Sequence, residues 1–164
     1  METLLTNIAL IVSLLAIVIQ DFKHRAIHIV WLGVLLTTSL LLFLLKGIDL
    51  LWLGKTLLFV MAVIFLMWVY ICIKQRGVIN PFKNHIGEGD LLFFIAVVPL
   101  FSLLNYMAFF ICGMIFSAVF SLLFLKKMKE RMIPLAGLLA VFILMLKGIV
   151  FITGDDLFYT LTFL

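Results

Sequence analysis

The chain has 164 residues, of which 66% are hydrophobic and 12% charged, and its formal net charge is +4. Soluble domains are about 45–50% apolar and about 25% charged. The composition therefore excludes a water-soluble domain and predicts an integral membrane protein. The excess of basic over acidic residues does not require a nucleic-acid partner, because Lys and Arg at membrane borders orient a chain and contact anionic lipid headgroups. Two cysteines without metal-ligand spacing give no reason to expect a metal or another cofactor.

Six apolar runs are candidates for helices that cross the bilayer, which takes about 20 mostly apolar residues. The N-terminus lacks the basic segment and cleavage site of a signal peptide, so we expect the first run to be a retained span. The weakest boundary lies near Pro99 and Asn105, where five spans with one long kinked helix remain an alternative. The sequence predicts an all-α, polytopic protein with one transmembrane domain over 1–164 and spans at 4–20, 27–45, 48–73, 91–104, 106–125 and 133–152.

The basic residues alternate between the two sides of these spans. Nine of the twelve Lys and Arg residues fall in odd-numbered connections: two in the first, three in the third and four in the fifth. Only Lys46, Lys55 and Lys147 fall on the other side. The positive-inside rule then predicts that the odd connections are cytoplasmic and that both termini lie outside. We expect a multi-pass protein of the plasma membrane.

Two aspartates stand at span borders on the predicted cytoplasmic side. Asp21 follows the first apolar run, and Asp90 immediately precedes the fourth. An ionised carboxylate is costly to keep near hydrocarbon, so both positions call for a reason. The fourth run is short, so either the bilayer thins there or the helix begins earlier and draws Asp90 toward the lipid. Gly87 and Gly89, which flank Glu88, would let another backbone or a substrate approach closely.

A shared site for the two carboxylates would give them a specific chemistry. They could not both ionise easily, so the pair would hold one proton. The ionised partner would take a proton from an attacking water, while the protonated partner would hydrogen-bond the carbonyl oxygen of a peptide. Their own helix ends favour Asp90 as the anion and Asp21 as the acid. The alternative is that both are solvated side chains just outside the lipid.

These motifs resemble those of the type IV prepilin peptidases, which are Gly-x-Gly-Asp membrane aspartyl proteases. The family's first motif is an Asp at the end of the first span followed by basic residues and Ile-Pro-Asn, and residues 21–29 are similar to it. Its second motif, Gly-x-Gly-Asp-x-Lys-Leu, is similar to residues 87–93. A proline-containing stretch that enters the last span is similar to residues 133–137.

The resemblance implies a short aspartic endopeptidase without the Cys-rich insert of long members. Its substrate would be a prepilin-like or pseudopilin-like membrane protein, whose basic leader is removed at the cytoplasmic membrane face. His28 and Ile29 stand where the family has Pro-Asn, and Leu92 stands where it has Lys. We expect these differences to alter substrate positioning rather than the hydrolytic chemistry.

Four further residues are candidates for contact with such a substrate. Glu88 would bind a Lys or Arg of the leader. Lys23 and Arg25 would steady the aspartate pair or substrate carboxylates, or they would anchor the chain to lipid headgroups. Pro134 would shape the last helix near the pair, or simply begin that helix.

Two other functions are alternatives to the peptidase. A small proton-coupled transporter would use Asp21 and Asp90 as an ion relay, but acidic residues near mid-span would then be expected. A non-catalytic assembly component of a pilus or secretion system is the second alternative. Leu92 and the absence of the Pro-Asn pair are compatible with such a non-catalytic component.

Overall fold

The computed structural model describes residues 2–75, 87–124, 134–154 and 158–159, and these ranges contain helices and connections but no strands. Four helices, α1, α3, α5 and α6, are long and apolar enough to cross a membrane, and α2 is a shorter apolar helix. The described residues thus confirm the predicted all-α class and are consistent with a membrane protein, although four rather than six helices are long enough to be candidate spans. The elements are α1 (Glu2–His24), α2 (Ile29–Leu45), α3 (Leu50–Lys74), α4 (Glu88–Val97), the 3-10 helix η1 (Val98–Leu100), α5 (Leu103–Phe124) and α6 (Leu135–Thr153).

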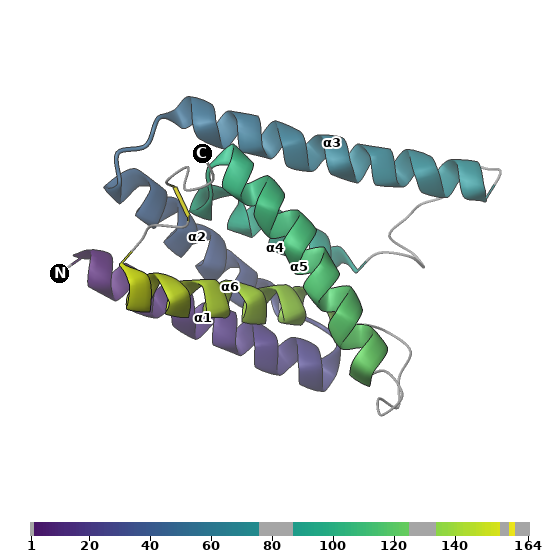
Figure 1. The fold of residues 1–164 in the computed structure, drawn as a ribbon, viewed down its shortest axis with the longest axis horizontal. Helices are drawn as coiled ribbons and strands as arrows, with labels where there is room; N and C mark the ends of the chain where they lie inside the picture. The colour runs from purple at the N-terminus through teal and green to yellow at the C-terminus, as the bar shows by residue number, and fades with distance from the viewer. Residues whose placement is uncertain (1, 76–86, 125–133, 155–157, 160–164) are drawn as a thin grey trace.

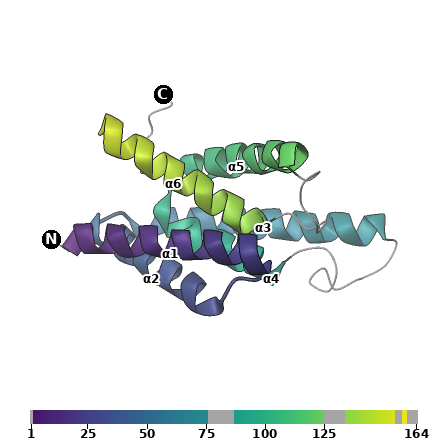
Figure 2. The ribbon, with the colours of Figure 1, turned by 90° about the horizontal axis from the view of Figure 1, so that it is seen from below.

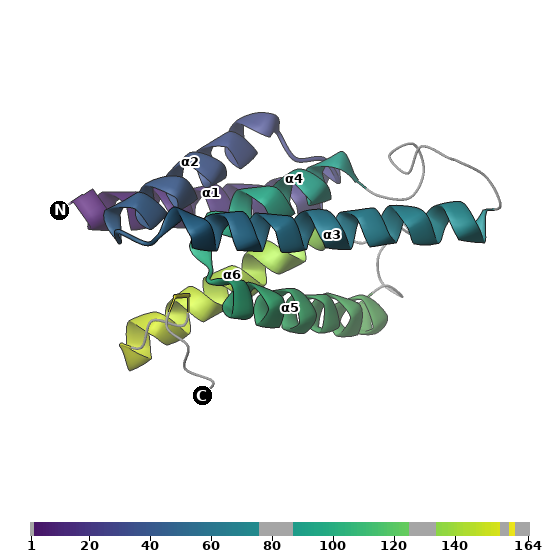
Figure 3. The same ribbon diagram turned by 90° about the horizontal axis from the view of Figure 1, so that it is seen from above.

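Successive helices run in alternating directions along the long axis of the bundle (Figure 1). The last turn of α1 and the first turns of α4 and α6 therefore lie toward the same end, which we call the aspartate end because it holds Asp21 and Asp90. The first turns of α3 and α5 lie toward the opposite end. Helices α5 and α6 lie on one side of the bundle and α1 to α4 on the other (Figures 2 and 3).

The fourth and fifth helices are separate elements with bounds that differ from the prediction. The predicted span 91–104 is wrong at both ends: α4 begins earlier, at Glu88, and ends at Val97, while α5 begins at Leu103. The chain turns at η1, where Pro99 supplies no N–H to continue an α-helix. Because α4 and α5 run in opposite directions (Figure 3), the alternative of one long kinked helix is also wrong.

Side chains from two neighbouring helices satisfy the carbonyl groups that the end of α4 leaves open. The hydroxyl of Ser39 in α2 donates to the carbonyl oxygen of Ala96 at 2.8 Å, and Tyr106 in α5 donates to that of Phe94 at 3.1 Å. The last four carbonyls of a helix have no partner within it, and lipid offers none. These two bonds therefore fix α4, and with it Asp90, against the bundle.

Helix α3 lies at the edge of the bundle and extends beyond the other helices toward the aspartate end (Figures 1 and 3). Only three of its 25 residues are buried, namely Thr56, Val60 and Ile71. Helices α1, α2, α4 and α6 supply most of the core, whereas α3 leaves most of its apolar surface exposed.

Candidate functional site

The first turn of α6 presents two backbone N–H groups at the aspartate end. Pro134 precedes the helix, and its carbonyl oxygen accepts the first helical hydrogen bond from Leu138 at 3.0 Å. The N–H groups of Ala136 and Gly137 come before that bond, so they have no acceptor within α6. No side chain of α6 caps them. Together with the positive end of the helix dipole, they favour a negatively charged partner.

Both candidate aspartates supply that partner. Gly137 donates its N–H to Asp21 Oδ2 at 2.6 Å, and Ala136 donates its N–H to Asp90 Oδ1 at 3.0 Å. Adjacent backbone nitrogens of a helix are only ~3 Å apart, so the two bound oxygens lie within about 9 Å of each other. Asp21 is 6% exposed, and Asp90 is partly buried. The structure therefore brings residues from the ends of α1 and α4 to one point on α6.

The contacts of the two carboxylates differ. Asp90 lies outside the four helices long enough to cross the membrane. Burial raises the pKa of Asp90 to about 6. The hydrogen bond from Ala136 opposes this increase, and the negative charge of Asp21 adds to it. Asp21 is buried as well, but its carboxylate accepts the shorter hydrogen bond, from Gly137, and the guanidinium of Arg25 also attracts it. These contacts favour Asp90 as the protonated partner and Asp21 as the anion, which reverses the assignment made from their own helix ends.

The difference arises because the sequence-based assignment considered only α1 and α4. The start of a third helix, α6, contacts both side chains, so helix dipoles do not separate them. Arg25 then breaks the symmetry. It adopts a left-handed backbone conformation with a φ of 53°, so that α1 ends at His24, and its N–H donates to the carbonyl oxygen of Asp21 in the last turn at 3.1 Å.

Two glycines give the carboxylates the space that they occupy. A Cβ at Gly137 would lie 2.9 Å from Asp21 Oδ2 and 3.2 Å from Cδ2 of Phe22. A Cβ at Gly87, which precedes α4, would lie 3.0 Å from Asp90 Oδ2. Gly89 instead faces Ile27, where an added Cβ would make ordinary contact at 3.4 Å. Gly137 is thus the position where the site tolerates a side chain least.

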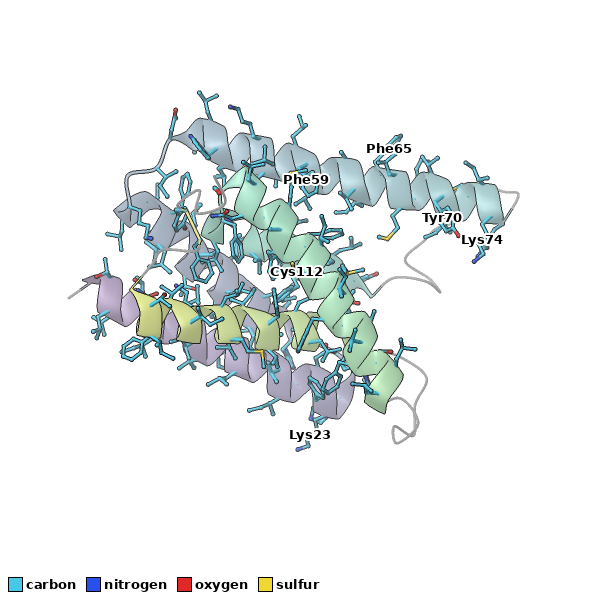
Figure 4. All side chains as sticks on the ribbon, viewed as in Figure 1. Lys23, Phe59, Phe65, Tyr70, Lys74 and Cys112 are labelled. Atoms are coloured by element: carbon cyan, nitrogen blue, oxygen red, sulfur yellow. The ribbon has the colours of Figure 1, made fainter. Side chains whose placement is uncertain are left out.

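The other predicted site residues are less closely associated with the two aspartates. Lys23 is exposed and points away from the bundle (Figure 4), so the structure does not bring it to the aspartates. Glu88 is exposed in the first turn of α4, open to a partner from outside. Pro134 is buried before the first turn of α6, where its position fits shaping the start of the helix rather than direct contact with a substrate. Leu92, the departure from the family motif, is 42% exposed.

Sequence reasoning missed the two amide donors of the site. Every residue except proline carries a backbone N–H group, so no particular residue type in the sequence marks such a donor. The signal was the start of an apolar helix at 134–137 that has no Ser, Thr, Asp or Asn at its beginning and therefore needs a cap from elsewhere. Gly137 was visible in the motif, but its packing against Asp21 was not.

The chain was compared with family models, curated proteins and solved structures, and none of them matches it. Within the described parts of the chain, no group of three or more His, Cys, Asp or Glu side chains is arranged to hold a metal ion. The aspartate site is therefore the feature of the described residues from which a function can be inferred.

Proposed function

We propose that this protein is a membrane aspartic endopeptidase that removes the basic leader of prepilin-like proteins at the cytoplasmic membrane face. One observation carries the proposal: Asp21 and Asp90, distant in sequence, accept hydrogen bonds from adjacent N–H groups of α6. The resemblance of the surrounding motifs to type IV prepilin peptidases supports the same activity. The predicted six-span topology, with the odd connections in the cytoplasm, would put the aspartate end on the side where leaders lie.

The raised pKa of Asp90 fits the acid in this mechanism. Protonated Asp90 donates a hydrogen bond to the carbonyl oxygen of the scissile peptide and polarises it. Ionised Asp21 removes a proton from a water molecule whose oxygen attacks the carbonyl carbon. The proton of Asp90 passes to the oxygen of the tetrahedral intermediate. Collapse of that intermediate breaks the C–N bond. The proton held by Asp21 goes to the leaving amine, and one hydroxyl of the intermediate returns a proton to Asp90 as the new carboxylic acid forms.

The N-terminus of α6 has a positioning role in this proposal. Its two N–H groups hold the carboxylates in fixed places, which lowers the entropy cost of assembling acid, base and water. The hydrogen bond from Gly137 and the guanidinium of Arg25 both favour the ionised state of Asp21 and so help to keep the single proton on Asp90.

The direct test is cleavage of a reporter substrate by the purified full-length protein. The reporter carries a basic leader, a glycine and an apolar helix, and mass spectrometry locates the cut. Cleavage between the leader and the helix supports the proposal. An intact reporter, together with proton uptake in liposomes or stable assembly with the uncleaved reporter, would favour the transporter or the assembly component instead.

The rate of cleavage is expected to fall as pH rises through about 6. Asp90 has its pKa raised from 3.8 to about 6, so it is protonated below this value and loses its proton above it. Because the mechanism needs the protonated form, kcat/KM should decrease about tenfold per pH unit well above 6. A pH–rate profile on detergent-solubilised protein measures this. A rate that is constant between pH 5 and 8 would contradict the assignment of Asp90 as the acid.

Glu88→Gln is expected to weaken selection for a basic leader without removing activity. Glu88 is exposed at the start of α4, two residues before Asp90, so a leader Lys or Arg could reach it. An exposed ion pair of this kind contributes about 1 kcal/mol at most, which corresponds to roughly a fivefold change in KM. Reporters with leader Lys replaced by Gln measure the preference. If wild type and variant discriminate equally between the reporters, Glu88 does not bind the leader.

A further inference from the structure

A second candidate binding site lies at the end of the bundle opposite the aspartates. A cavity of about 690 Å³ opens between the N-terminal halves of α3 and α5. Apolar side chains form its walls, including Leu58 and Ala62 from α3 and Met107 from α5. Phe59, labelled in Figure 4, also lines it and packs edge-on against two aromatic rings of α5. This cavity belongs to a different helix pair from the aspartate site.

Two opposite charges line the same cavity near the beginning of α3. Asp49 caps the helix, with one carboxylate oxygen accepting the N–H of Leu51 at 3.3 Å, so its second oxygen is left for another donor. Lys55 also lines the cavity, and it forms no hydrogen bond, ion pair or ring contact with any other residue that the structure describes. The two residues are six apart, beyond the three- or four-residue spacing at which helical side chains pair.

The other two basic residues of this end are already engaged within the protein. Lys46 lies over the ring of Tyr159 at 4.3 Å. Lys147 lies over the ring of Phe158 at 4.4 Å and donates to Asn7 Oδ1 at 3.0 Å. Lys55 is therefore the basic side chain at this end, within the described residues, that an external anion would satisfy.

The position of the charges along α3 matches the layers of a membrane border. Trp52 lies between Asp49 and Lys55 in sequence, and tryptophan is enriched at the level of lipid headgroups. Ala62 follows Asp49 by 13 residues, which is ~20 Å along a helix. The cavity thus runs from a charged mouth at headgroup depth to an apolar floor at acyl-chain depth.

The volume and charges of the cavity suit a lipid. Its volume of about 690 Å³ lies within the range of ligand pockets. Its apolar walls complement an acyl chain, and Asp49 and Lys55 at its mouth complement a headgroup that carries both charges.

We propose that the cavity binds a phospholipid whose headgroup carries both a phosphate and a primary ammonium, as in phosphatidylethanolamine. Lys55 binds the phosphate, and the second oxygen of Asp49 accepts a hydrogen bond from the ammonium. One acyl chain lies against Leu58, Ala62 and Met107. The paired charges select this headgroup over phosphatidylglycerol, which lacks the ammonium, and over phosphatidylcholine, whose trimethylammonium has no hydrogen to donate.

The proposal is tested on the full-length protein in detergent, without any protease substrate. Phosphatidylethanolamine, phosphatidylcholine and phosphatidylglycerol with identical acyl chains are titrated separately. Binding is followed by the unfolding midpoint Tm and by native mass spectrometry. Saturating phosphatidylethanolamine is expected to raise Tm by about 5 °C, and the other two lipids by clearly less.

Three variants connect the effect to the cavity. Gly54→Leu fills it, because an added Cβ at Gly54 has no atom within 4 Å and the residue lines the cavity. This variant is expected to lose the Tm shift, whereas Gly33→Leu, an equally open glycine on α2, is expected to keep it. Lys55→Gln is expected to weaken binding about tenfold. Asp49→Asn keeps a capping side chain but should abolish the preference for phosphatidylethanolamine over phosphatidylglycerol.

Several outcomes would overturn the proposal. Equal Tm shifts from all three lipids in the wild-type protein would show that the headgroup is not recognised. A full shift in Gly54→Leu would place the lipid elsewhere. Native mass spectra in which a second polypeptide, and no lipid, remains bound would identify a protein as the occupant. The wild-type lipid comparison decides the matter even if a variant fails to fold.

Discussion

Replacement of either Asp21 or Asp90 by asparagine is expected to lower kcat for leader cleavage by at least ~10³-fold while leaving the fold intact. The Asp21→Asn variant has no base to take a proton from water, and the Asp90→Asn variant has no acid proton to transfer. The fold should persist because an asparagine side-chain oxygen accepts the same N–H of Gly137 or Ala136 that the carboxylate accepts.

The measurement compares single-turnover cleavage rates of the reporter with Tm and gel-filtration profiles of the same preparations. Asp155→Asn, which changes an acidic residue near the C-terminal end of the chain, is the matched control and should cleave at the wild-type rate. Cleavage that persists in either Asp21→Asn or Asp90→Asn would show that the two carboxylates are not an acid–base pair. Loss of cleavage together with loss of the monodisperse folded protein would assign them a structural role.

The second large effect is expected from Gly137→Ala, a change of one methyl group. The added Cβ would lie 2.9 Å from Asp21 Oδ2 and 3.1 Å from Asp21 Cβ, so the aspartate or the start of α6 must move. A displacement of ~1 Å in a catalytic group can lower activity by about 10²-fold. The accompanying loss of stability should be only about 1–3 kcal/mol, as is usual for overpacking at a single site.

Gly148→Ala is the matched control because it makes the same change on the same helix. An added Cβ at Gly148 has no atom within 4 Å, so activity should be unchanged and stability should rise by up to about 1 kcal/mol. The pair of variants separates a local effect on Asp21 from a general effect of alanine in α6. Equal activities in Gly137→Ala and Gly148→Ala would show that close packing of α6 on Asp21 does not matter for function.

The sequence determined the class of the protein and the position of most helices. Apolar runs long enough to cross a bilayer must form helices, because lipid offers no partner for open backbone groups. The bounds therefore agree within about three residues for α2, α3, α5 and α6, whereas α1 continues beyond its predicted end at residue 20 to His24 and includes Asp21. The fourth helix was misplaced because α4 is short, and its ends are set by Gly87 before it, Pro99 after it and the side chains of Ser39 and Tyr106.

The sequence also singled out the two aspartates, because charge beside a long apolar run is visible without any structure. What it could not provide was the third element of the site. The amides of Ala136 and Gly137 have no side-chain signature, and more than 40 residues separate them from either aspartate. Their contact exists only because α6 packs with its first turn against the end of α1 and the start of α4.

The sequence does not show which carboxyl group of the pair holds the proton, because that depends on which groups lie near each one in space. Helix ends along the chain favoured an ionised Asp90. The tertiary structure instead puts Arg25 near Asp21 and the negative charge of Asp21 near a buried Asp90, whose pKa rises to about 6. Sequence alone thus singled out two carboxyl groups beside long apolar runs. Only packing decided what surrounds each of them, because electrostatic interactions depend on distances in space rather than along the chain.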